Sequence, residues 1–168
     1  VSDSLKDELQ RTLGTTDCNA FLIPFRSNYC GRFMRFGEWS GERKLRLFRR
    51  GAGRFDDAPV HERIHVEGRT GRMQGRILHY SVRTRGEMRD KSRRYARLGA
   101  ESAFAAGKRA TRSTALARGG WAFIRSFLLK GGVLDGWKGF TLSIDVASAT
   151  HQRYRHLATM SRTAGSPH

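Results

Sequence analysis

The segment Lys44-Leu-Arg-Leu-Phe-Arg-Arg50 alternates apolar and basic side chains, and this period of two predicts a β-strand. Glycines at 51 and 53 predict a turn after it. A short extended segment over 60–66 and the strand-like run Arg76-Ile-Leu-His-Tyr80 follow, with a glycine-punctuated hairpin between them. The first half of the chain is therefore expected to form a sheet of short strands.

The residues before this stretch predict one helix and one further strand. Leu5, Leu9 and Leu13 recur at helical spacing, and Ser2 or Asp3 can cap a helix over 2–13. The apolar run within 17–25 predicts a strand, and a turn-rich segment follows at 27–31.

The second half of the chain has helical periodicity. Residues 87–107 predict a basic amphipathic helix, and we expect one apolar face made of Met88, Tyr95, Gly99, Ser102 and Ala106. A basic connector that includes Arg118 should follow it. The apolar segment 121–154 predicts two helices broken at its glycines, because charged residues interrupt it too often for a membrane-spanning helix.

This order of elements predicts an α+β fold. We expect a sheet-containing part over 1–84, a basic, amphipathic helical extension over 85–160 and a disordered tail over 161–168. The cysteines, Cys18 and Cys30, have no metal-binding spacing and are expected to be reduced thiols, although a hairpin disulfide is the alternative.

The charge of the chain predicts an anionic partner. Its 168 residues include 32 Lys and Arg against 15 Asp and Glu, a net charge of +17. Nucleic acid, phosphorylated sugars and an anionic membrane surface all satisfy this charge. No helix-turn-helix, zinc-finger or single-strand-binding pattern appears, so a specific nucleic-acid partner is not expected.

Glu62 and His79 are the residues with the clearest chemical potential. A carboxylate and an imidazole on neighbouring extended segments can supply a general base and a metal ligand. In the alternative, Glu62 is a surface carboxylate paired with Arg63 or Arg46, and His79 is structural.

Several short motifs together resemble the C-terminal part of bacterial family 2 inverting glycosyltransferases, in particular the lipopolysaccharide-core glucosyltransferases. The motifs are Asn28-Tyr29 with Gly31-Arg32, Gly37-x-Trp39, Arg43-Lys-Leu-Arg-Leu-Phe-Arg49, Val60-His-Glu62, Leu78-His-Tyr80, Arg94-Tyr95 and Leu134-Asp-Gly-Trp-Lys-Gly139.

The resemblance implies the back half of a GT-A-like domain followed by C-terminal amphipathic helices. Such enzymes bind a nucleotide sugar and a divalent metal, Mn or Mg, through an Asp-x-Asp motif, and this sequence contains no Asp-x-Asp. The expectation is that the nucleotide-binding half and most of the metal site lie outside these residues. The sequence would then be part of a hexosyltransferase that is inactive alone and acts on a glycolipid acceptor.

The resemblance also implies roles for individual residues. Glu62 would be the catalytic base that deprotonates the acceptor hydroxyl, and His79 would complete the metal coordination. The substrate-binding candidates are Trp39, Arg43, Arg46 and His61. The alternatives are that Trp39 and His61 pack structurally and that the two arginines are solvated strand charges.

The helical half suggests contact with a membrane surface. Trp121 and Trp137 can insert shallowly, while Arg125 and Lys138 can meet anionic headgroups. We therefore expect a cytoplasmic protein, peripheral on the inner face of the bacterial cytoplasmic membrane. One alternative is a helix pair packed on the nucleotide-binding half. Another is a basic, non-catalytic module for membranes or nucleic acid.

Overall fold

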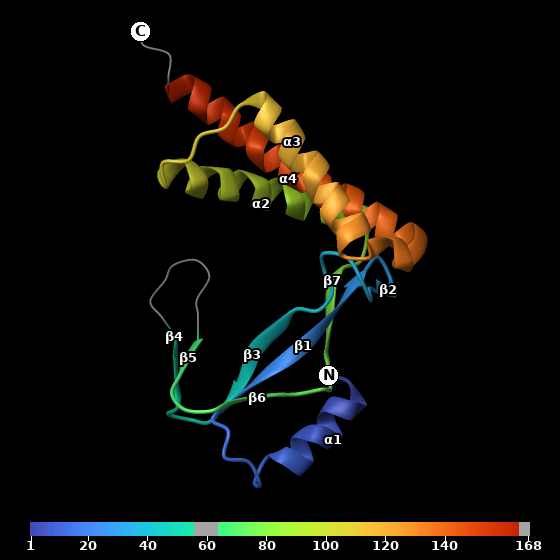
Figure 1. The fold of residues 1–168 in the computed structure, drawn as a ribbon, viewed down its shortest axis with the longest axis vertical. Coiled ribbons are helices and arrows are strands. Elements are labelled where there is room, and N and C mark those ends of the chain that lie inside the picture. Colours follow the sequence, from blue (N-terminus) through green and yellow to red (C-terminus); the bar gives the residue numbers. More distant parts are fainter. Residues whose placement is uncertain (56–63, 165–168) are drawn as a thin grey trace. The chain divides into compact units, whose positions relative to one another are not determined.

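The computed structural model describes residues 1–55 and 64–164, which form two compact units (Figure 1). The sheet unit comprises Val1–Ser27 and Gly41–His79, and the helical unit comprises Asn28–Ser40 and Tyr80–His168. The chain passes between the units within two of its strands. Strands come first and long helices last, which confirms the α+β class.

The sheet unit is built around its longest strand, β1 (Ala20–Tyr29). Within this unit β3 pairs with β1 antiparallel and β6 pairs with it in parallel, while β4 and β5 form a separate antiparallel hairpin. We expected a turn from residue 27, whereas β1 continues to Tyr29. The other strands are β2 (Arg32–Phe33), β3 (Arg43–Phe48), β4 (Gly53–Phe55), β5 (Ile64–Val66), β6 (Thr70–Arg72) and β7 (Ile77–Val82).

Helix α1 (Asp3–Thr12) covers the core of the sheet unit and confirms the predicted N-terminal helix. The Ser2 side chain accepts a hydrogen bond from the Leu5 amide and caps the helix. Leu5 is buried with Phe21 and Met73. A Cβ at Gly75 would lie 2.3 Å from the Leu5 Cα, so this helix can approach the chain only because residue 75 is glycine.

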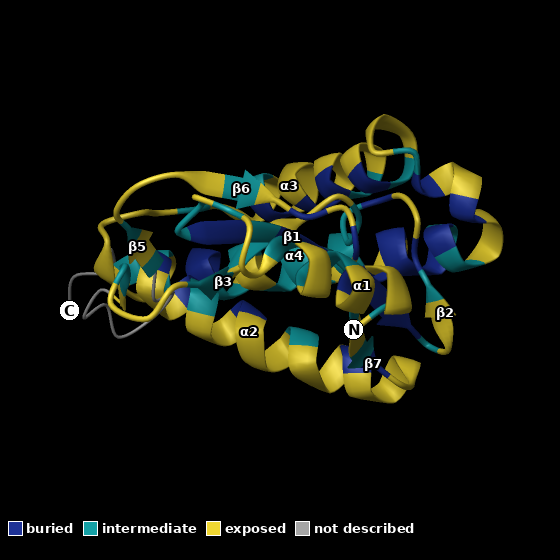
Figure 2. Ribbon diagram, turned by 90° about the horizontal axis from the view of Figure 1, so that it is seen from below, coloured by how far each residue is buried: buried dark blue, intermediate teal, exposed yellow. Residues whose placement is uncertain are grey.

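Three long helices and two short ones form most of the helical unit. Helices α2 and α3 both pack against α4, and Figure 2 shows their outer sides as largely exposed. The helices are α2 (Arg85–Ala105), α3 (Arg112–Ile124), the π-helix η1 (Arg125–Leu129), the 3-10 helix η2 (Gly132–Asp135) and α4 (Gly136–Ala164). The expected break near Gly131-Gly132 is confirmed.

The buried face of α2 differs from our prediction. Met88 is buried, but Tyr95 is 62% exposed. The other buried positions are Ala96, Ala100 and Ala103, because small side chains allow α2 to approach α4 closely. The helix therefore packs through a stripe of alanines, whereas the prediction had placed larger residues such as Tyr95 on the buried face.

Two boundaries in this unit also differ. The expected basic connector contains the first part of α3, which begins at Arg112 after the cap residue Thr111. Helix α4 continues to Ala164, so residues 161–164 of the expected disordered tail are helical. Within the described residues, no helix has the length and apolar content needed to cross a membrane. Both cysteines are free thiols, as expected.

Candidate functional site

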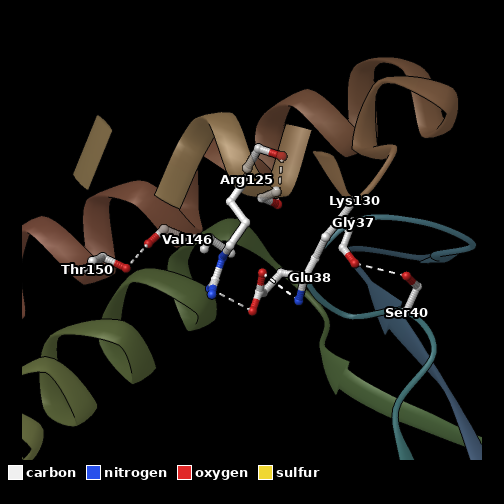
Figure 3. Close-up of polar contacts among 9 residues, drawn as sticks. Gly37, Glu38, Ser40, Arg125, Lys130, Val146 and Thr150 are labelled. Atoms are coloured by element: carbon white, nitrogen blue, oxygen red, sulfur yellow. Dashed lines mark hydrogen bonds and ion pairs between the residues drawn. The ribbon is translucent and has the colours of Figure 1, made fainter. Parts of the chain in front are cut away.

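Trp39 lies in a tight loop of the helical unit, Gly37–Ser40, which we call the Trp39 loop. Gly37 has a φ of 77°, a conformation that favours glycine. Its amide donates to the Lys130 carbonyl at 2.8 Å, and its carbonyl accepts from the Ser40 hydroxyl at 2.9 Å (Figure 3). The loop is thus closed on itself and attached to the end of η1.

Asp135 holds the residues just before this loop. Its side chain is 1% exposed, and its Oδ2 accepts from the amides of Arg35 and Phe36 at 2.9 and 2.8 Å. A Cβ at Gly139 would lie 1.8 Å from the Gly132 carbonyl oxygen, so η2 can fold against the start of α4 only with glycine there. This close packing fixes the position of Asp135.

Glu38 provides the third attachment of the Trp39 loop. Its Oε1 lies 3.0 Å from Arg125 Nη2 and its Oε2 lies 3.1 Å from Lys130 Nζ (Figure 3). The Glu38 side chain is 25% exposed, and solvent screens the partly exposed cations, so the cluster stabilises the loop by about 1 kcal/mol. Arg125 opens the π-helix, a distortion often found at functional sites.

Trp39 packs on a tyrosine that belongs to a largely buried polar network. The Trp39 ring meets Tyr29 edge-on, with centroids 5.7 Å apart. The Tyr29 hydroxyl donates to Asp145 Oδ2 at 2.5 Å, and Arg85 pairs with Asp145 Oδ1 at 3.0 Å. Burial and then the bond to Asp145 raise the pKa of Tyr29 to about 12, so its hydroxyl stays a proton donor.

Trp39 lines a pocket of about 310 Å³ between α2 and α4. Tyr95 is the second aromatic residue at this pocket, Ser92 and Thr150 bring hydroxyls, and Lys91 and Arg153 bring positive charge. A pyranose has apolar C–H faces that stack on aromatic rings and hydroxyls that need polar partners. The pocket has the size and chemistry for one sugar ring.

The sheet unit brings two other candidates together on one aromatic ring. Arg46 lies with its guanidinium carbon 5.9 Å from the Phe25 ring centroid, and the His79 ring meets Phe25 edge-on at 6.0 Å. Sequence reasoning missed Phe25, which gave no signal beyond an apolar strand position. Arg43 is separate: its Nη1 donates to the Met73 carbonyl at 2.8 Å, a structural contact.

His79 shares the Phe25 ring with two cationic side chains, and its predicted role as a metal ligand remains a prediction. Lys44 lies 5.4 Å from the same Phe25 ring, so cations gather there. No three His, Cys, Asp or Glu residues are placed to hold a metal among residues 1–55 and 64–164. Glu62 and His61 fall at 56–63, outside the described residues, so their predicted roles remain predictions.

The segment 121–137 exposes large apolar side chains, which we call the apolar segment. Its members are Trp121, Ile124, Leu128, Leu129, Val133, Leu134 and Trp137, of which Trp137 is the most exposed at 73%. Trp137 stacks on Phe140, which meets Phe123 and Phe127 edge-on. The two predicted tryptophans are therefore at the surface.

The two predicted membrane-facing cations have partners within the protein. Arg125 pairs with Glu38, and Lys138 Nζ donates to the Cys30 carbonyl at 3.1 Å. These contacts leave the exposed rings and leucines as the distinctive feature of the segment.

Comparison with known proteins adds no family, because no family model matches the sequence and no solved structure matches the fold.

Proposed function

We propose that this protein is the acceptor-side portion of a glycosyltransferase that takes a hexose from a nucleotide sugar and adds it to a lipid-linked glycan. It would work peripherally on the inner face of the bacterial cytoplasmic membrane. The observation that supports this most strongly is the double role of residues 125–137, which lie beside the Trp39 loop. Arg125, Lys130 and Asp135 hold the loop, while residues between them belong to the apolar segment.

A lipid-linked acceptor imposes two requirements on an enzyme. The lipid stays in the bilayer, so the protein needs an apolar surface that enters the interface. The sugar must be held close to that surface, because the lipid tethers it. In the helical unit, one segment of chain exposes leucines and tryptophans and also anchors Trp39, which lines the sugar-sized pocket.

The charge of the helical unit is also suited to anionic lipid. Residues 102–134 contain Lys and Arg but neither Asp nor Glu. Each basic residue near an anionic membrane adds about 1 kcal/mol of attraction. A non-catalytic membrane-binding module would share these properties, so catalysis must be tested separately.

Catalysis in this proposal depends on Glu62, whose role comes from the resemblance to family 2 glycosyltransferases. As a base it would accept the proton of the acceptor hydroxyl while that oxygen attacks the anomeric carbon and the nucleoside diphosphate leaves. The transfer inverts the anomeric configuration. The donor-binding residues, including most ligands of any Mn or Mg, would be supplied by an upstream segment.

The test is sugar transfer by the protein extended upstream to include the donor site. Glu62→Gln should abolish transfer to a membrane-extracted glycolipid while donor binding, measured by calorimetry, is unchanged. Glu67→Gln is the matched control, since Glu67 is an exposed carboxylate five residues away. Near-normal turnover in Glu62→Gln would refute the base assignment. No transfer by the unmodified extended protein, combined with tight vesicle binding, would favour the non-catalytic module.

A further inference from the structure

A second cavity lies in the helical unit, between the start of α3 and the second half of α4. Its volume is about 1060 Å³. Arg112 and Thr111 border it from α3, and His151, Arg155 and Arg162 border it from α4. We call it the arginine groove. Its cationic lining sets it apart from the smaller pocket beside Trp39.

The part of the sequence that forms the walls of the arginine groove contains few acidic residues. From residue 102 to the end of the chain, the only acidic residues are Asp135 and Asp145. Both are buried, and Asp135 bonds to backbone amides while Asp145 bonds to Tyr29 and Arg85. None of the residues that line the groove is therefore acidic.

The shape of the arginine groove is fixed by small residues and one hydroxyl. A Cβ at Gly119 would lie 2.9 Å from the His151 Cβ, so α3 and α4 touch closely beside the groove. The floor includes Ala115, which is 1% exposed. The Ser161 hydroxyl oxygen accepts from the Ala110 amide at 3.1 Å and donates to the Leu157 carbonyl at 2.8 Å, which ties the start of α3 to α4.

The start of α3 adds polarity of the same sign. Thr111 caps the helix by accepting from the Thr114 amide at 3.2 Å. The amides of Arg112 and Ser113 belong to the first turn, where a helix has no internal acceptors for them. Together with the helix dipole they favour an anion at this end of the groove.

We infer that the arginine groove binds a phosphorylated sugar. A guanidinium group binds two phosphate oxygens at once, and Arg112 of α3 and Arg155 of α4 line the same cavity. The volume slightly exceeds the range of about 300–1,000 Å³ that is usual for small-molecule sites, so it is larger than inorganic phosphate needs. Phosphate recognition follows from the groove alone, whereas the sugar rests on the proposed function.

Binding can be tested by NMR titration of the intact protein with glucose 6-phosphate, inorganic phosphate and glucose. Glucose 6-phosphate should shift the amide signals of Arg112 and Ser113 and bind more tightly than phosphate, while glucose should leave them unchanged. Arg112→Ala and Arg155→Ala should each weaken binding by about tenfold, the loss of one paired phosphate contact. Arg89→Ala removes one exposed charge from α2 and should have no effect.

Three results would overturn the inference. Equal weakening by Arg89→Ala would show general charge attraction only. Unmoved amides at millimolar glucose 6-phosphate would remove the site. Binding to phosphatidylglycerol vesicles that needs Arg112 and Arg155, without glucose 6-phosphate binding, would make the groove a lipid contact. If the protein binds glucose 6-phosphate but its upstream-extended form transfers no sugar, only the proposed function is refuted. If the extended form transfers sugar but the groove does not bind glucose 6-phosphate, only the inference about the groove is refuted.

Discussion

Asp135 offers the sharpest test of how the Trp39 loop is held. Replacing it with alanine removes the acceptor of two amides, those of Arg35 and Phe36. A buried donor without a partner costs about 1–3 kcal/mol. Both amides are only partly buried and water can reach them, and the cost of burying the carboxylate disappears. We therefore expect Asp135→Ala to lower the free energy of unfolding by about 2 kcal/mol.

Asparagine at this position separates the charge from the hydrogen bonds. Asp135→Asn keeps an oxygen for the two amides but loses the charge assistance, so it should cost about 1 kcal/mol. The control is Asp90→Asn, since Asp90 is 79% exposed and lies 3.8 Å from Arg93. Loss of such a surface pair should cost less than about 0.5 kcal/mol.

Urea unfolding gives these free energies, and fluorescence reports on the loop itself. The chain has three tryptophans, so Trp121→Phe with Trp137→Phe leaves Trp39 as its only one. In that background Asp135→Ala should make Trp39 more accessible to acrylamide, because the loop loses two anchors. An unfolding free energy within about 0.5 kcal/mol of the parent, with unchanged quenching, would refute the anchoring role of Asp135.

Two further changes test the apolar segment and the network beneath Trp39. Trp137→Ser should weaken binding to phosphatidylglycerol-containing vesicles by about fivefold to tenfold, because a large exposed ring no longer enters the interface. The control is Tyr80→Ser, which removes another exposed ring. Equal losses of vesicle binding in the two variants would contradict a special role for Trp137. Tyr29→Phe should cost about 1–2 kcal/mol at neutral pH. The folded-state pKa of Tyr29 is raised from 10.0 to about 12, so the folded protein keeps a proton that the unfolded chain releases. Stability should therefore fall as pH rises from 10 to 12, and an equally steep decline in the Tyr29→Phe variant would contradict this account.

The helices of this protein could be predicted where a local pattern matched the eventual core. Leu5 and Leu9 gave the first helix because both side chains pack in the sheet unit. Helix α3 was missed because the basic residues around its start, from Lys108 to Arg118, were interpreted as a connector. Its buried positions, Ala115, Gly119 and Ala122, follow helical spacing and were the available signal.

The candidate site could be predicted only in part, because its bonds join distant segments. Trp39 was recognised from its motif, but the Glu38–Arg125 pair spans 87 positions and the Tyr29–Asp145 bond spans 116. No local pattern marks such pairs. Arg125 and Lys138 were expected at a membrane for their charge alone, and their contacts with Glu38 and the Cys30 carbonyl depend on the fold.

Under the proposed function, the arrangement of residues 125–137 would link membrane contact to the geometry of the pocket beside Trp39. The Lys130 carbonyl accepts a hydrogen bond from the Gly37 amide, and the Lys130 side chain pairs with Glu38. The neighbouring Leu129 is 65% exposed. If Leu129 enters a bilayer interface, its position becomes restricted. The position of Lys130, the next residue in the chain, is then restricted as well. The Trp39 loop would then be steadier on the membrane than in solution. A vesicle-bound protein whose Trp39 is quenched as readily as the free protein would contradict this link.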